Sequence, residues 1–338
     1  MSTRPDHQTL RGAIALATRA PSVHNTQPWQ WLLGDSTVHL MADRTRQLPA
    51  TDPDGRDLAL SCGAALHHLR IALGALGWAS KIHRLPNPAD PGHLAAIEPH
   101  PHTPSEEDIA LAAAIPLRRT DRRTFSSWSV PTGHLDLMMQ RASQAGALLV
   151  PITDTHFRHH LVTAINEAAT RQETDPAYAT ELAQWSGRSE FAEDGVLAAS
   201  APRHPEYRGD TRMRTFPHGT LTESATDLAE DDAGELLVLA TPDNDLTSWL
   251  RAGEAASAAL LTATELNLAS CPLSQALEIT DTRAAIRKLV LDDAAEPHLI
   301  LRVGWTHTAA KPLPRTPRRP LHDVLGYLPG TTPRQNER

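Results

Sequence analysis

The sequence predicts a mixed fold of helices and strands that is built from two related halves. Residues 57–78 and 247–269 are two long segments with the nearly continuous apolar character of centrally buried helices. Residues 235–241 and 297–305 are short apolar runs with the length of buried strands. Taken alone, this pattern is compatible with either an α+β or an α/β arrangement.

An internal echo indicates that the two halves are related. A shift of 190 positions places residues 63–80 over residues 253–270, and five of these 18 positions are identical, among them Gly63 and Gly253. Each copy of the echo lies in one of the two long apolar helices. We therefore expect the halves to pack like the subunits of a symmetric dimer.

The first half is expected to open with a short helix and a polar loop. Pro21 ends the helix, because the residue before a proline is pushed out of the α region. The prolines crowded into residues 87–104 predict a loop, with a boundary between halves 1–104 and 105–338. The elements expected before the boundary are a helix at 9–19, strands at 30–33 and 37–41, a turn at 51–55 and the helix at 57–78.

The second half opens with a well-marked helix start. Ser105 followed by three acidic residues predicts a capped helix with an acidic first turn. Asp175-Pro176 predicts a break in a later helix. The expected elements are helices at 105–115, 131–147 and 156–183, a strand at 148–152, the strand at 235–241, the helix at 247–269, a tight connection at 271–275, the strand at 297–305 and a short segment at 321–328.

Residues 187–222 show no clear periodicity. The stretch contains Gly, Pro and Arg, and it is long for a structureless connection inside a compact domain. Such a stretch is usually a functional lid or a disordered insert. The sequence favours neither of these two interpretations over the other.

Composition excludes several classes of protein. The chain has 338 residues, 40% of them apolar, and a net charge of −8, which argues against a disordered chain and against a nucleic-acid binder. Two cysteines without a C-x-x-C spacing, and 18 scattered histidines, predict no disulfide framework and no metal site. The polar N-terminus and the lack of an apolar run of ~20 residues favour a soluble cytoplasmic protein without a membrane partner.

Residues 118–125 combine four arginines, two threonines and an aromatic residue. Arginine stays charged and presents a fork of donors that matches phosphate geometry, so this stretch predicts a binding site for a dianion. Arg118, Arg119 and Arg122 are the strongest candidates, and Thr120 adds a hydroxyl. A solvated charged surface is the alternative interpretation of a basic run.

Residues 21–29 form a second polar stretch, closed at both sides by Pro21 and Pro28. Ser22, Asn25 and Gln27 offer hydroxyl and amide groups that can bond to a polar ring edge or a polyol. A helix-capping turn beside a buried Trp29 is the alternative interpretation of this stretch.

Together these stretches resemble the nitroreductase-like flavoproteins, and more narrowly the actinobacterial Acg-type family of NAD(P)H nitroreductases. Residues 20–29 are similar to the A-P-S-x-x-N-x-Q-P-W motif of that superfamily, and residues 118–122 to its R-R-S-x-R phosphate motif. Residues 267–272 resemble the helix end that leads to the flavin face. Arg318-Arg319-Pro320 resembles the basic tail that returns to the phosphate.

The resemblance implies an α+β fold with a mostly antiparallel sheet in each half, and one complete, non-covalent FMN site between the halves. The loop motif occurs only in the first half and the arginine motif only in the second, so a second site would be vestigial. The residues expected to bind FMN are Pro21, Ser22, Asn25, Gln27, Arg118, Arg119, Thr120, Arg122, Pro272, Leu273, Ser274, Gln275, Arg318 and Arg319.

Two functions follow from the resemblance. The first is a flavin-centred NAD(P)H oxidoreductase, in which NAD(P)H docks transiently and electrons pass by a ping-pong scheme to a nitro-aromatic or quinone-like acceptor. The second is a protein that stores or sequesters FMN under a lid. Ser274-Gln275 stands where many nitroreductases have Glu-Gly, and the added bulk of Gln275 puts access of nicotinamide and substrate in question. Because the duplication is internal, the protein is expected to be a monomer or a homodimer.

Overall fold

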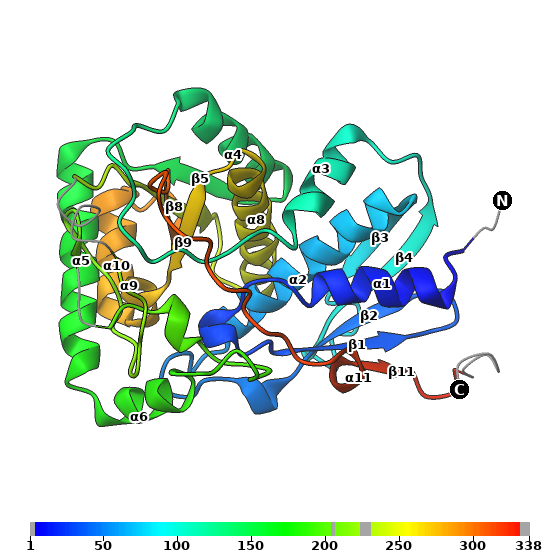
Figure 1. Cartoon of the computed structure of the whole chain (residues 1–338). Helices are drawn as coiled ribbons and strands as arrows, with labels where there is room; N and C mark the ends of the chain where they lie inside the picture. The colour runs from blue at the N-terminus through cyan, green and yellow to red at the C-terminus, as the bar shows by residue number, and fades with distance from the viewer. Residues whose placement is uncertain (1–3, 204–206, 224–230, 332–338) are drawn as a thin grey trace.

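A computed structural model describes residues 4–203, 207–223 and 231–331, and it contains two separate β-sheets with helices between and around them (Figure 1). The first sheet has five strands in the order β11-β1-β2-β4-β3. All its pairings are antiparallel except that of β11 with β1. Its strands are β1 (Trp29–Leu33), β2 (Val38–Ala42), β3 (Trp78–Arg84), β4 (His93–Pro101) and β11 (Leu325–Tyr327).

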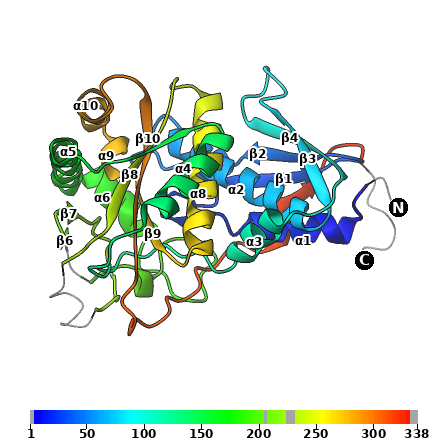
Figure 2. The same ribbon diagram turned by 90° about the horizontal axis from the view of Figure 1, so that it is seen from above.

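The second sheet lies at the opposite end of the molecule and is antiparallel throughout (Figure 2). Its strand order is β5-β8-β10-β9. Its strands are β5 (Leu148–Pro151), β8 (Glu235–Thr241), β9 (Ala269–Leu273) and β10 (Glu296–Gly304); a small ribbon, β6 (Tyr207–Arg208) with β7 (Thr211–Arg212), is separate. Helices and mostly antiparallel sheets make this an α+β fold, which confirms the fold class that was expected.

Helices cover both sheets and fill the space between them. The α-helices are α1 (His7–Ala17), α2 (Arg56–Ala75), α3 (Glu106–Ala114), α4 (Thr132–Gln144), α5 (Thr155–Glu173), α6 (Pro176–Gln184), α8 (Leu246–Glu265), α9 (Gln275–Glu278), α10 (Thr280–Val290) and α11 (Leu321–Val324). Short 3-10 turns occur at η1 (Val23–Asn25), η2 (Arg44–Arg46) and η3 (Ala198–Ser200). The expected break at Asp175-Pro176 and the expected cap at Ser105 are both present.

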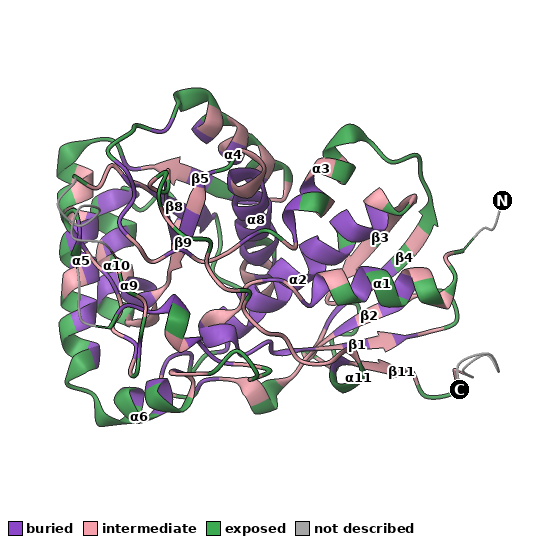
Figure 3. Ribbon diagram, viewed as in Figure 1, coloured by how far each residue is buried: buried purple, intermediate pink, exposed green. Residues whose placement is uncertain are grey.

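The core is organised around α2 and α8, which lie side by side in the centre and are buried along most of their length (Figure 3). By length and composition alone, α2 is the one helix among the described residues that could cross a membrane, and 89% of its apolar window is buried inside the protein. That apolar character is what packing against α8, α1 and the first sheet requires.

The contact between α2 and α8 repeats itself at an offset of 190. A Cβ placed on Gly63 would lie 2.0 Å from the carbonyl oxygen of Leu250, and one on Gly253 would lie 2.0 Å from that of Leu60. His67 bonds to Ser257, its own counterpart, at 2.8 Å from Nδ1 to Oγ. When two residues are in contact and the two residues related to them by the offset are in contact as well, the interface has two-fold symmetry.

The two sheets also have the same topology. In each half, two antiparallel strands precede the central helix, and two further antiparallel strands follow it, the second of which pairs back onto the earlier ones. The strand β1 corresponds to β5, β2 to β8, β3 to β9 and β4 to β10. The strand β11 comes from the end of the chain and adds to the edge of the first sheet. We retain the division near residue 104 as a proposal, with β11 crossing it.

The secondary structure of two proline-containing segments was predicted wrongly. Residues 87–104, expected to be a loop, contain β4, and residues 271–275 belong largely to the strand β9. Pro99 and Pro101 lie where β4 pairs only with β3, and Pro272 lies on an edge strand. Proline is tolerated at such positions because no ladder hydrogen bond is needed from it on the free side.

The 187–222 segment makes specific contacts in its described parts, 187–203 and 207–222. Val196, Ala201 and Phe216 form a small apolar cluster with two residues of α6. The backbone of Gly195 bonds to Asn25 of the first half. In these parts the segment is therefore a packed structure, and its remaining residues, 204–206, lie outside the described ones.

Candidate cofactor and ligand site

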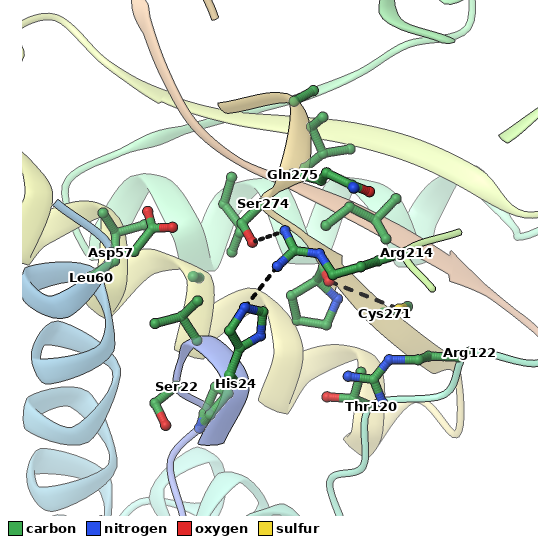
Figure 4. A pocket seen from close by; sticks show the side chains of 18 of the residues that line it. Ser22, His24, Asp57, Leu60, Thr120, Arg122, Arg214, Cys271, Ser274 and Gln275 are labelled. Carbon is green, nitrogen blue, oxygen red and sulfur yellow. Dashed lines mark hydrogen bonds between the residues drawn. The ribbon is translucent and has the colours of Figure 1, made fainter. Parts of the chain in front are cut away.

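A cavity lies where the two halves meet, and both of them contribute to its walls (Figure 4). It contains about 1050 Å³ of space free of protein atoms, its open mouth included. Its walls come from the loop after α1, from α2 and α8 at the molecular two-fold, from β9 and the start of α9, and from the 187–222 segment. Much of the wall is apolar, through Leu60, Leu260, Leu299 and Ile300.

A second, smaller cavity of about 460 Å³ adjoins the first. The two share five wall residues: Pro21, Ser22, His24, Thr120 and Arg122. The smaller one is lined in addition by Arg118, Arg318 and Asn25, so the apolar chamber continues into an arginine-lined one. The structure thus brings Pro21, Ser22 and the 118–122 motif together, although about 100 residues separate them in the chain.

Arg118 is the residue of the smaller cavity that most clearly indicates an anionic ligand. Its side chain is buried, and neither Nε nor Nη1 has a hydrogen-bond partner among the described residues. Burial, and then the charges of Arg119 and Arg19, lowers the pKa of Arg118 to about 10, so the group still carries its charge at neutral pH. A buried guanidinium without a partner is costly, so this site calls for an anion that the protein itself does not supply.

Arg318 approaches the same cavity from the C-terminal tail. It donates to the carbonyl oxygens of Thr18, Arg19 and Ala20, which positions it without neutralising its charge. Its pKa is lowered well below the ordinary value, first by burial and then by Arg118. Among the described residues, neither Arg318 nor Arg118 forms an ion pair with a carboxylate, so the cavity keeps a strong positive potential.

Three predicted site residues lie outside both cavity walls. Arg119 donates to the carbonyls of Pro116 and Arg118. Arg319 bonds to the carbonyl of Gln27 and pairs with Asp43 at 3.4 Å. Gln27 is fully buried, donates to the carbonyl of Glu193 and accepts from the backbone N–H of Arg319. In the structure these three side chains bond to groups close to the cavities and do not line the cavities themselves.

The loop at residues 22–27 is held in an uncommon backbone conformation. His24, Asn25 and Gln27 all have positive φ angles, of 46°, 57° and 53°. Ser22 Oγ accepts from the N–H of Gln27, and Asn25 donates to the carbonyls of Gly195 and Pro317. The other amide atom of Asn25, Oδ1, is buried without a partner. Positive φ at side-chain-bearing residues is costly and is found disproportionately at functional sites.

The predicted residues at 272–275 line the larger cavity as a group. Pro272 and Leu273 end β9, Ser274 precedes α9, and Gln275 is the first residue of α9. The Oγ of Ser274 donates to Glu278 at 2.7 Å. Gln275 is buried and lines the larger cavity.

Arg214 was not predicted, yet it reaches into the larger cavity from the 187–222 segment (Figure 4). It contacts His24 Nε2 at 3.0 Å and Ser274 Oγ at 3.3 Å, and it forms an ion pair with Glu278. Because a guanidinium only donates, His24 Nε2 must accept, which leaves a neutral ring with its proton on Nδ1. Burial lowers the pKa of His24 well below its ordinary value, in agreement with that state.

Nothing in the sequence pattern pointed to Arg214, because its partners are distant and the segment around it has no periodicity. Asp57 was also missed as a wall residue, since it begins an apolar run that is typical of a core helix, and Cys271 was not singled out within the connection at 271–275. Across the described residues, no group of three His, Cys, Asp or Glu side chains could hold a metal ion.

Comparison with known proteins places the chain in a family. It is 44% identical, over 96% of its own length and 92% of the other's, to "Putative NAD(P)H nitroreductase Rv3131" of Mycobacterium tuberculosis. It is 37% identical, over 94% of its length and 95% of the other's, to "Putative NAD(P)H nitroreductase acg" of the same organism. The chain belongs to the Acg-type nitroreductase family. This confirms the resemblance seen in the motifs. No protein-family model matches the chain.

Solved structures with a similar arrangement are more distant from this nitroreductase-family chain. The FMN-dependent nitroreductase NfnB of Mycobacterium smegmatis, in complex with NADPH, is 16% identical, with a TM-score of 0.40 over 64% of this chain and 96% of that one. A nitroreductase of Bacteroides fragilis with bound FMN is 15% identical, with a TM-score of 0.38 over 61% of this chain and 93% of that one.

Proposed function

We propose that this chain is an FMN-dependent NAD(P)H oxidoreductase with one FMN bound between its halves. The observation that carries the proposal is the pair of joined cavities, one mostly apolar and one lined by unneutralised arginines. An apolar chamber that continues into a cationic pocket matches a ligand with a flat aromatic body and a phosphate tail. The names of the relatives, which specify an NAD(P)H nitroreductase, support the same assignment.

The residues present fit an FMN molecule. Arg118, with two buried and unpartnered nitrogens, together with Arg318 and Arg122 would hold the phosphate. Ser22 and Thr120 line both cavities and would contact the connecting polyol. Asn25 lines the smaller cavity, and its acceptor atom Oδ1 has no partner among the described residues.

When bound, FMN supplies the two-electron redox chemistry, and the protein supplies orientation and electrostatics. The apolar wall keeps water away from the reacting face, and β9 with α9 forms one side of the chamber. NAD(P)H and a nitro-aromatic or quinone-like acceptor would use this chamber in turn, which corresponds to a ping-pong scheme. Gln275 and Arg214 narrow it, so they would set which acceptors enter.

The second candidate function is storage of FMN behind a closed lid, and Arg214 is the observation that favours it. The 187–222 segment inserts Arg214 into the chamber and holds it there through His24, Ser274 and Glu278. If those contacts persist, bulky reductants are excluded from the chamber. The two functions therefore differ in whether the Arg214 contacts open during turnover.

An anaerobic reduction experiment tests both functions. The purified protein is loaded with FMN and mixed with NADPH, and the flavin absorbance is followed for wild type and Arg214→Ala. Rapid bleaching of the wild type establishes the reductase. A wild type that keeps its colour, with a variant that bleaches, favours storage behind the lid. A protein that cannot be loaded with FMN at all contradicts both functions.

A further inference from the structure

Arg122 is held where the two cavities join by contacts with the 187–222 segment. The residue lines both cavities, and Figure 4 shows its side chain directed into the larger one. Its Nη1 donates to the carbonyl oxygen of Ser200 at 2.9 Å. Its Cζ lies 4.6 Å from the centre of the Phe216 ring, within the range of a cation–π attraction. Both partners belong to the segment, so the segment determines where this guanidinium lies.

The backbone of Arg122 depends on the same segment. Its carbonyl oxygen accepts Nε of Arg208 at 3.1 Å. Arg208 forms an ion pair with Glu223, the residue that follows the segment, and the two side chains are only 1% and 4% exposed. The Oε1 atom of Glu223 in turn accepts the N–H of Thr124 at 2.6 Å. One buried ion pair therefore bonds to the backbone at two points, one on either side of residue 123.

A second buried ion pair fixes the next residues from the side of the second sheet. Arg302 of β10 pairs with Asp232, and their side chains are 1% and 3% exposed. The Nη1 atom of Arg302 donates to the carbonyl oxygen of Arg123 at 3.1 Å. Oδ2 of Asp232 accepts the N–H of Phe125 at 3.0 Å. Residues 122–125 belong to no helix or strand, so these side chains supply the hydrogen bonds that secondary structure would otherwise provide.

The charge of Arg122 is not neutralised by the protein around it. Among the described residues it forms no ion pair with a carboxylate, since the neighbouring Asp121 pairs with Arg123. Only its Nη1 has a hydrogen-bond partner there. Burial lowers the pKa of Arg122, so an anion bound beside it would stabilise its charged form. A buried ion pair adds little net stability, because both charges lose their hydration; here two such pairs have the effect of fixing the loop that carries Arg122.

We propose that the 187–222 segment, together with Glu223, is a built part of the anion site, and that Arg208 and Glu223 are positioning residues that hold Arg122 against the phosphate of the cofactor. This assignment rests on the binding of FMN, which both candidate functions share, and it gives the segment a role that a lid does not have. A lid slows the exchange of any flavin, whereas a positioning segment strengthens the binding of flavins that carry a phosphate.

FMN and riboflavin, which lacks the phosphate, separate these two roles. The apoprotein is titrated into each flavin, and fluorescence quenching gives the two dissociation constants. We expect Glu223→Gln to weaken FMN binding at least about tenfold, the scale of one charged hydrogen bond, because Arg122 loses its fixed position. Riboflavin binding is expected to stay the same, because riboflavin makes no phosphate contact. Arg208→Lys keeps a charge beside Glu223 but lacks the Nε donor, so it should also weaken the binding of FMN alone.

Asp210→Asn is the matched control, because it also removes a carboxylate from an ion pair of the same segment. Asp210 pairs with Arg158 of α5 at 2.8 Å from Oδ2 to Nε, and neither residue lines either of the two cavities. We expect this variant to leave both dissociation constants unchanged. A double variant tests the route through Arg122: adding Glu223→Gln to Arg122→Gln should weaken FMN binding little further, because both changes act on the same contact.

The outcomes separate this role from the proposed function. If Glu223→Gln weakens neither flavin, weakens both equally, or has no more effect than Asp210→Asn, the positioning role is overturned and FMN binding stands. If Glu223→Gln does not fold, hydrogen exchange of the wild type decides instead. Saturating FMN should slow amide exchange in residues 119–125 and 207–222 more than saturating riboflavin does, and equal slowing overturns the role. A wild type that binds neither flavin overturns the proposed function and this role together.

Discussion

At the scale of single residues, the site is defined by groups that lack partners. Arg118 and Asn25 each have a buried polar atom with no partner in the described structure, and both line the smaller cavity. Arg119, next to Arg118 in the chain, also has a buried Nε without a partner, but its Nη1 donates to backbone carbonyls and the residue lies outside the cavity wall. The arginine motif therefore contains residues with different tasks, which its composition could not reveal.

The two neighbouring arginines provide a matched pair for a binding experiment. Arg118→Gln should weaken FMN binding by ~1.5–3 kcal/mol, the scale of a hydrogen bond to a charged group. Arg119→Gln should weaken it much less, because its side chain faces backbone carbonyls. Quenching of flavin fluorescence during titration measures both affinities. A larger loss for Arg119→Gln would place the phosphate on the other side of the motif.

At the scale of elements, α2 and α8 hold the halves together at a glycine contact. Gly63 and Gly253 each lie against a backbone carbonyl of the facing helix, so even a methyl group has no room there. The larger cavity is lined by residues of both helices, such as Asp57 and Ala256. Packing of these two helices therefore shapes the site directly.

Gly63→Ala tests this contact against an alanine that fits. We expect the substitution to destabilise the protein by roughly 1–3 kcal/mol, the usual cost of overpacking, because the helices must separate. Gly12→Ala in α1 is the control, since a Cβ there meets nothing within 4 Å. That variant should gain up to ~1 kcal/mol from helix propensity. Chemical denaturation measures both, and equal effects would contradict the tight contact.

At the scale of the whole molecule, the chain is organised as a dimer within one polypeptide. The 190-residue offset relates α2 to α8, Gly63 to Gly253 and His67 to Ser257, and the two sheets share one topology. The functional motifs do not follow this symmetry, because the polar loop comes from the first half and the arginine motif from the second. We therefore propose that only one of the two symmetry-related positions binds FMN.

Cofactor stoichiometry tests this asymmetry. We expect about one FMN per chain, because one set of loop and arginine motifs builds one site. Native mass spectrometry of the reconstituted protein counts FMN and chains together, so it also distinguishes a monomer from a homodimer. A ratio near two FMN per chain would show that both positions are complete.

The sequence by itself determined the helices and strands of the core, the relation between the two halves and the family of the chain. Those features can be recognised in the sequence itself, from apolar runs, from the spacing of motifs and from a repeat at a fixed offset. Proline obscured β4 and β9, because their tolerance of proline depends on which neighbours each strand pairs with. Only the tertiary structure decided which arginines line a cavity, and only it placed Arg214 and Asp57 in the chamber. Those outcomes depend on contacts between distant segments, which no local pattern records.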